Sequence, residues 1–217
     1  MKKIIAVLMV LALTAVCLCA CGNKDTKEAK RKQYAVGKTV EFGRYEQDGN
    51  DKNGKEKIEW IVLDRDGDNA LLISKYALDC MEKQENDKFK DYEWEGWRVR
   101  QWLNGAFYDA AFSADEKEYI NTTVTDAEKE TEDKVFVLSV EEAKKYYKDR
   151  DDRTCEPTEY AEKQGVYTAS NGSCWWWLRS PGDYNRVCWE GSIHSGDFTK
   201  DYVDFGIRPV IRVKLFK

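Results

Sequence analysis

The chain has 217 residues, and 40 aspartates and glutamates against 35 lysines and arginines give it a formal net charge of −5 at pH 7. This acidic balance argues against a nucleic-acid partner, because binding a phosphate backbone requires a basic face. His194 is the only histidine, so metal sites built on two or three histidines are excluded and a serine hydrolase triad would be strained.

The first 21 residues have the pattern of a secretory signal peptide: Lys2 and Lys3, an apolar run from Ile4 to Ala20, and then Cys21. The end of this run, Leu-Cys-Ala-Cys, resembles the bacterial lipobox, in which the first mature residue is a lipidated cysteine. We therefore expect a lipoprotein signal peptide over residues 1–20. Lipid on Cys21 would anchor the protein to the outer face of the cell membrane. The alternatives are an ordinary signal peptide and an N-terminal transmembrane helix, for which this apolar run is marginal in length.

The mature chain divides into a short polar segment and one domain. Residues 21–35 are almost all polar after the cysteine, and such a segment predicts a flexible tether. Residues 36–217 are enough for a single domain with a sizeable core, and no linker divides them.

The first half of this domain is predicted to contain strands. Residues 36–45 alternate between apolar and polar side chains, which is typical of a strand. Residues 47–57 are rich in Asp and Asn, but their glycine spacing does not match an EF-hand calcium loop, and a hairpin loop is the better interpretation. Residues 58–64 and 70–74 are apolar runs on either side of an Asp-Gly pair, which predicts a tight hairpin. Residues 79–97 are predicted to be irregular.

Helices are predicted for the middle of the chain. Apolar residues recur at helical spacing over residues 98–112, and two capping boxes, Ser113 with Glu116 and Ser139 with Glu142, open further helices. A buried strand is predicted over 134–139 and a polar loop over 150–157. A short helix is predicted over 158–163, closed by Gly165.

The last part of the chain is predicted to return to strands, over residues 174–180, 186–189 and 207–215. Strands at both ends with helices between them favour an α+β fold with a mainly antiparallel sheet and two to four short helices.

The sequence contains no recognisable catalytic motif: the nucleophile elbow, the HExxH zinc motif, the P-loop and the dinucleotide fingerprint are all missing. We therefore expect no catalytic residue, no metal and no cofactor. An enzyme that acts on cell-envelope material through a carboxylate pair, with acids such as Glu59 or Asp64, is an alternative. His194 is expected in an exposed turn.

The run of three tryptophans at 175–177 is the strongest candidate for a binding site. In a strand, Trp175, Trp177 and Arg179 would share one face, and tryptophan beside arginine suits stacking on sugar or aromatic rings. Trp94 and Trp97 from the irregular segment are predicted to join this ligand-binding surface. The alternative is that both faces of the strand are covered and that Arg179 and Arg208 form structural ion pairs with acids.

Four cysteines besides Cys21 belong to the mature chain, and an extracellular address permits disulfides between them. Three connectivities are possible, and the sequence does not choose among them. The four residues are Cys80, Cys155, Cys174 and Cys188.

Several segments of the chain, in order, resemble a bacterial family of uncharacterised domains, domain of unknown function 6273. The resemblance covers about residues 36 to 215 and is carried by EWIVLD at 59–64, LLISKY at 71–76, RQWLN at 100–104, VFVLS at 135–139, WWLRSPG at 176–182 and GIRPVI at 206–211.

This resemblance implies no established activity, so no residue inherits a role from it. The order of elements is similar to the C-type lectin-like fold, although the Glu-Pro-Asn and Trp-Asn-Asp motifs of calcium-dependent sugar binding are missing. We therefore expect an extracytoplasmic binding module without catalysis, whose ligand is a glycan, a cell-envelope fragment or a surface protein. A purely structural surface protein is the third possibility.

Overall fold

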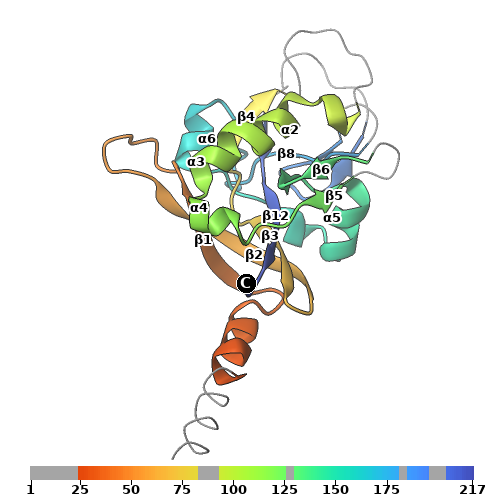
Figure 1. Ribbon diagram of the computed structural model, residues 1–217. Helices are drawn as coiled ribbons and strands as arrows, with labels where there is room; N and C mark the ends of the chain where they lie inside the picture. The colour runs from red at the N-terminus through yellow and green to blue at the C-terminus, as the bar shows by residue number, and fades with distance from the viewer. Residues whose placement is uncertain (1–23, 83–92, 126–129, 181–184, 196–203) are drawn as a thin grey trace, which may run out of the picture.

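The computed structural model describes residues 24–82, 93–125, 130–180, 185–195 and 204–217 (Figure 1). The expected signal peptide and the lipidation site at Cys21 lie outside these residues. Within the described ranges, no helix combines the length and the apolar character that crossing a membrane requires.

The strands form two five-stranded sheets and one two-stranded sheet. The first sheet is antiparallel, with the spatial order β1 (Thr39–Tyr45), β2 (Glu56–Asp66), β3 (Asn69–Ser74), β12 (Val210–Lys214) and β7 (Val135–Phe136). The second sheet has the order β10 (Ile193–His194), β9 (Arg186–Val187), β8 (Trp176–Trp177), β11 (Asp204–Ile207) and β4 (Asp79–Glu82). The third sheet pairs β5 (Thr123–Val124) with β6 (Glu132–Asp133).

Short helices connect these sheets. A continuous helical segment comprises α2 (Arg98–Trp102), the π-helical turn η2 (Leu103–Phe107) and α3 (Tyr108–Ala111). Further α-helices are α4 (Ala114–Lys117), α5 (Val140–Tyr146) and α6 (Glu159–Lys163), and residues 24–33 form another at the start of the described chain. Single 3-10 turns are η1 (Trp94–Gly96) and η3 (Asp151–Arg153). Among the named strands of the described residues, only β8 and β11 pair in parallel. The α+β class with mainly antiparallel sheets is therefore confirmed for the described residues.

The hairpin predicted around the Asp-Gly pair is present. Asp66 pairs with Asn69, so Gly67 and Asp68 form a two-residue turn between β2 and β3. Gly67 has a φ of +56°, a conformation that glycine adopts without steric cost. Both capping boxes are present as well, with Ser113 beginning α4 and Ser139 beginning α5. These features are local, and local sequence was sufficient to predict them.

The segment predicted as a flexible tether is different in the structure, because residues 24–33 form a helix. Tertiary contacts hold it: Arg31 donates a 2.8 Å hydrogen bond to Asp68, and the charged groups of Lys27 and Lys30 lie 5.3 and 5.6 Å from the ring centre of Phe216. Figure 1 shows this helix beside the C-terminus. A polar segment with little apolar surface of its own thus packs on the last residues of the chain.

Two other expectations were wrong. Residues 79–82 form strand β4 rather than irregular structure, because β11 supplies its hydrogen-bonding partner from far along the chain. The single strand predicted over 207–215 is two strands, since the chain leaves the second sheet after Ile207 and enters the first sheet at Val210. Proline at position 209 lacks an amide hydrogen for a ladder, which suits it to this break.

The core is dominated by aromatic side chains. Trp60, Trp94, Trp97, Trp176 and Trp177 are each at most 1% exposed. Burying an aromatic side chain removes a large apolar area from water and contributes about 1.5–3 kcal/mol. The indole nitrogen of Trp60 donates a 2.6 Å hydrogen bond to the Phe42 carbonyl, so the polar atom of this ring is satisfied inside the core.

A second organising feature is the carboxylate of Asp133, which is completely buried at the end of β6. Its two oxygens accept hydrogen bonds of 2.6–3.1 Å from the side chains of Trp94, Arg100, Asn104, Thr125 and Thr131. Asn104 also bonds the backbone of Lys134 and Val135. One acid therefore joins the two-stranded sheet to η1 and to the helical segment that begins at Arg98.

We predict that Asp133→Ala lowers the free energy of unfolding by about 3 kcal/mol or more, because it leaves several buried donors without an acceptor. Urea denaturation followed by circular dichroism measures this. Glu132→Ala, the exposed neighbour in the same strand, should change stability by less than about 0.5 kcal/mol. Equal effects of the two substitutions would contradict the central role of Asp133.

Tyr45 and Asp79 form a buried polar pair between β1 and β4. The hydroxyl of Tyr45 donates a 2.6 Å hydrogen bond to Asp79, and the backbone amide of Cys80 donates a 2.7 Å bond to the same carboxyl group. Burial raises the pKa of Asp79 more strongly than these two bonds lower it. The folded protein therefore holds a proton on Asp79 more tightly than the unfolded chain does.

A raised pKa in the folded state stabilises the protein at low pH, and this contribution is lost as the pH rises through the folded-state value. We therefore predict that Asp79→Asn, which keeps an acceptor for Tyr45, becomes more favourable relative to wild type as the pH rises from 4 to 7. Urea denaturation of both proteins at the two pH values measures the difference. A difference that is the same at pH 4 and pH 7 would contradict the raised pKa.

Candidate functional site

A tight hairpin over residues 166–175 places two aromatic side chains together. Thr168 and Cys174 form an isolated antiparallel bridge, and the amide of Ala169 donates a 2.9 Å bond to the Ser173 carbonyl. Tyr167 and Trp175 flank this bridge, and their ring centres are 6.5 Å apart with an edge-to-face orientation. Tyr167 is 51% exposed and Trp175 is partly exposed, so the pair is accessible to solvent.

Residues of the second sheet pack against Trp175 of this pair. The ring of Trp175 lies 5.4 Å from that of Phe205 in β11, and the Arg186 guanidinium of β9 lies 5.3 Å from Trp175 and 5.7 Å from Phe205. Arg186 is only 5% exposed, and burial lowers its pKa from the usual value. The Arg186 guanidinium and the Phe205 ring thus hold the Trp175 indole in place through cation–π and aromatic contacts.

A third exposed aromatic residue, Trp189, follows β9. It is 37% exposed, and its carbonyl accepts a 3.3 Å hydrogen bond from the side chain of Asn171 at the tip of the hairpin. We call Tyr167 and Trp175, with the buried Arg186 packed against Trp175, the aromatic surface. Tyr167 and Trp189 were missed in the sequence, although exposed aromatic residues next to Gly and Asn turns were the available signal.

Four of the five predicted ligand-binding residues do not lie on an exposed surface. Trp177 is fully buried, with its ring 4.4 Å from Phe205 and 5.8 Å from Trp97. Trp94 and Trp97 are also buried and pack on each other at 5.5 Å. These rings form a continuous part of the core, which corrects the expectation of an exposed tryptophan face; Trp175 alone of the predicted tryptophans reaches the surface.

Arg179 is buried as well, and its guanidinium is satisfied within the protein. It forms a two-pronged contact with Glu142, with distances of 2.5 and 3.1 Å, and donates to the carbonyls of Thr125 and Val137. The structural ion pair that the sequence left open is therefore present, and it fastens Glu142 of the α5 capping box. The shared face predicted for Trp175, Trp177 and Arg179 fails because β8 is only two residues long.

Arg208 has a different environment from the one expected. Its Nε donates a 2.8 Å hydrogen bond to the Ser74 carbonyl and its Nη2 contacts the Lys75 carbonyl at 3.4 Å, while Nη1 is buried without a hydrogen-bond partner. Its guanidinium lies 5.2 Å from the ring centre of Trp176 and 5.6 Å from that of Tyr147. No acid of the described part of the chain forms an ion pair with Arg208, so this alternative is not confirmed.

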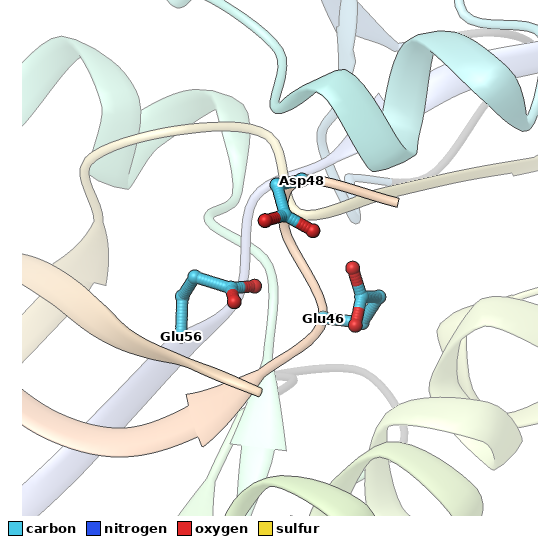
Figure 2. A group of neighbouring side chains, drawn as sticks. All are labelled: Glu46, Asp48 and Glu56. Atoms are coloured by element: carbon cyan, nitrogen blue, oxygen red, sulfur yellow. The ribbon is translucent and has the colours of Figure 1, made fainter. Parts of the chain in front are cut away.

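Three acids lie close together where the β1–β2 loop meets β2, as Figure 2 shows for the carboxylates of Glu46, Asp48 and Glu56. One oxygen of each carboxylate lies within 4.8 Å of one oxygen of the other two. Loop groups already bond each of them. Gln47 donates its amide hydrogen to Glu56, and Asn50 donates to both Glu46 and Asp48. The side chain of Asn53 bonds Asp48 and lowers its pKa. These bonds fold the hairpin loop, which is the role predicted for the segment.

The residues considered for catalysis lie in ordinary surface environments. Glu59 forms a 2.9 Å ion pair with Lys75, and Asp64 lies 3.9 Å from Lys145. The two carboxylates thus contact different lysines. His194 is exposed, as expected, but it lies in the short strand β10 rather than in a turn.

A family model described as "Domain of unknown function (DUF6273)" matches residues 67–215, which includes the aromatic surface, both five-stranded sheets except β1 and β2, and the helices from α2 onward. No curated protein and no solved structure matches the chain. The matched residues are more than half of the chain, and the protein therefore belongs to the DUF6273 family.

Proposed function

We propose that this protein is a lipid-anchored, extracytoplasmic binding module without catalysis, and that it binds a glycan or a glycan-bearing fragment of the cell envelope. The observation that carries this proposal is the exposed pair of Tyr167 and Trp175 backed by Arg186. Aromatic rings that stand partly in water provide a face on which a sugar ring stacks, and they have a large area to bury on contact.

The rigidity of the aromatic surface supports the same proposal. Trp175 packs on Phe205, and the Gly206 amide bonds the Trp175 carbonyl at 2.8 Å, so the backbone under the ring is part of the second sheet. A ligand that stacks on a ring held in this way loses less free energy to ordering the protein. The second candidate ligand is a surface protein. The binding experiment below separates the two, because a surface protein is not present on a glycan array.

The location in this proposal rests on the N-terminal sequence. The basic start, the apolar run and the Leu-Cys-Ala-Cys ending support export and lipidation at Cys21. We also propose a C-type lectin-like fold. The order of strands and helices, and the two five-stranded sheets with strands of unequal length, support it. The basic helix over residues 24–33 would then lie between the membrane and the domain.

We predict that Cys21→Ser moves the protein from the membrane fraction to the soluble fraction of expressing cells, because no lipid can be attached to serine by the same route. Cys19→Ser is the matched control, since it changes a neighbouring cysteine of the same segment and should leave the protein in the membrane. Immunoblots of fractionated cells measure the distribution. Membrane retention of the Cys21→Ser protein would contradict lipid anchoring at this residue.

For binding, we predict that the purified full chain gives a saturable signal on an array of glycans and peptidoglycan fragments, with quenching of tryptophan fluorescence. Tyr167→Ala and Trp175→Ala should each raise the Kd of the strongest array ligand by about tenfold or more, because each removes a stacking face. Val124→Ala, which shortens an exposed apolar side chain of β5, should leave the Kd within about twofold.

Two results would contradict this assignment. A folded protein that binds nothing on the array would redirect the search to surface proteins, through crosslinking on intact cells. Unchanged affinity in Tyr167→Ala and Trp175→Ala, with circular dichroism spectra equal to wild type, would show that binding occurs elsewhere on the molecule.

A further inference from the structure

Two buried cysteines meet next to Arg208. Cys155 is 3% exposed and Cys174 is completely buried. The amide of Cys174 donates a 2.8 Å hydrogen bond to the carbonyl of Cys155, so the two residues are adjacent across neighbouring chain segments. Their thiols also hydrogen-bond each other, so the two side chains point toward one another, as a disulfide requires.

The charge environment of Cys155 makes it the more acidic of the two. Its sulfur lies 3.6 Å from the Lys75 carbonyl, which Nη2 of Arg208 also contacts at 3.4 Å. Burial raises the pKa of Cys155, but a hydrogen bond from the Cys174 thiol and the positive charge of Arg208 outweigh it and bring this pKa to about 7. The pKa of Cys174 is raised, first by its hydrogen bond with Cys155 and then by burial.

The surroundings of Arg208 are an independent reason to expect a negative charge on the neighbouring Cys155 thiol. Its guanidinium is buried and its Nη1 has no hydrogen-bond partner among the described residues. Its neighbours are backbone carbonyls, aromatic rings, the Tyr147 hydroxyl and the thiols of Cys155 and Cys174, and none of them is a carboxylate. An uncompensated buried cation is costly, and a nearby group that ionises relieves part of that cost. The thiol of Cys155 is the group in contact with the same carbonyl.

We propose that Cys155 and Cys174 are a reversible dithiol–disulfide pair that external disulfides oxidise. In the first step the Cys155 thiolate attacks a low-molecular-weight disulfide, forms a mixed disulfide with one half and releases the other half as a thiolate. Cys174 then loses its proton to solvent and attacks the Cys155 sulfur, which forms the internal disulfide and releases the second thiolate. Two electrons pass from the two cysteines to the external disulfide, whose two halves leave as thiols.

The contacts of the Cys174 thiol favour Cys155 as its partner. Cys80 lies on β4, opposite Gly206 of β11, and the Gly206 amide bonds the Trp175 carbonyl next to Cys174. The strongest interaction of the Cys174 thiol is its hydrogen bond with Cys155, whereas its electrostatic interaction with Cys80 is weaker. Cys188 follows β9, and its thiol interacts with Arg186.

Stabilisation of the thiolate by Arg208 favours the reduced form of the pair, so the disulfide should be reducible by ordinary thiols. Both sulfurs are buried, and exchange therefore proceeds through local opening of the segments that carry them. In the cell, oxidation rests on the extracytoplasmic location proposed above, where disulfides form. The chemistry of the purified protein does not depend on that location.

The test equilibrates the purified full chain with oxidised and reduced glutathione in different ratios, followed by acid quenching, alkylation, proteolysis and mass spectrometry. We expect a linked peptide containing Cys155 and Cys174 in oxidised glutathione, and its loss in excess reduced glutathione, with Cys80 and Cys188 alkylated throughout. Cys155→Ser should abolish the linked peptide, and Cys188→Ser, the matched control, should leave the titration unchanged.

The wild-type peptide map decides the proposal even if Cys155→Ser does not fold. No linked peptide in oxidised glutathione, or a link that uses Cys80 or Cys188, would overturn the pairing. A Cys155–Cys174 link that excess reduced glutathione fails to break would overturn reversibility. Because this readout needs neither a membrane nor a glycan, its failure is separate from failure of the binding function.

Discussion

The buried guanidinium of Arg208 is the constraint around which both large sheets are arranged. It lies at the point where the chain leaves β11 of the second sheet and enters β12 of the first. Its hydrogen bonds hold the carbonyls at the end of β3, and the Ser74 amide in turn bonds the Pro209 carbonyl at 2.9 Å. Burying an arginine without an acid is expensive, and the rings of Trp176 and Tyr147 together with backbone carbonyls offset this cost.

The same position explains why the two cysteines next to it have unequal acidity. A cation in the interior attracts whatever negative charge its neighbours can supply, and a thiol becomes negative more easily than a tyrosine hydroxyl does. Packing and the proposed redox chemistry are thus linked, because the residue that joins the sheets also contributes to lowering the pKa of Cys155.

The tryptophans at 175–177 show how one sequence motif serves two roles. Trp176 donates a 3.0 Å hydrogen bond to the Arg153 carbonyl and Trp177 donates one to the Met81 carbonyl, so both are fixed inside the protein. Trp175 lies at the edge of the same core with Tyr167 beside it. The proposed binding surface is therefore an outward extension of the core, and its rings are held by the packing that stabilises the fold.

Local sequence was sufficient for the features that depend on a few neighbouring residues. The β2–β3 turn, both capping boxes, the helical segment from Arg98 and the closing glycine at position 165 all appear where predicted, because their hydrogen bonds are made within a few residues. The α+β class followed from the order of these elements. Of the candidate binding residues, Trp175 was the one that the sequence identified at the surface.

Long-range contacts decided the rest. Strand β4 exists because β11 pairs with it, and Trp177 and Arg179 are buried because Trp97, Phe205 and Glu142 from distant segments cover them. Cys155, Cys174 and Arg208 also meet only in the folded protein, and the sequence alone does not predict this contact. By itself, then, the sequence determined the fold class, the turns and the helix starts, where the physics is local. Only the tertiary structure decided which aromatic and charged side chains face water, because burial is set by what the rest of the chain places on top of them.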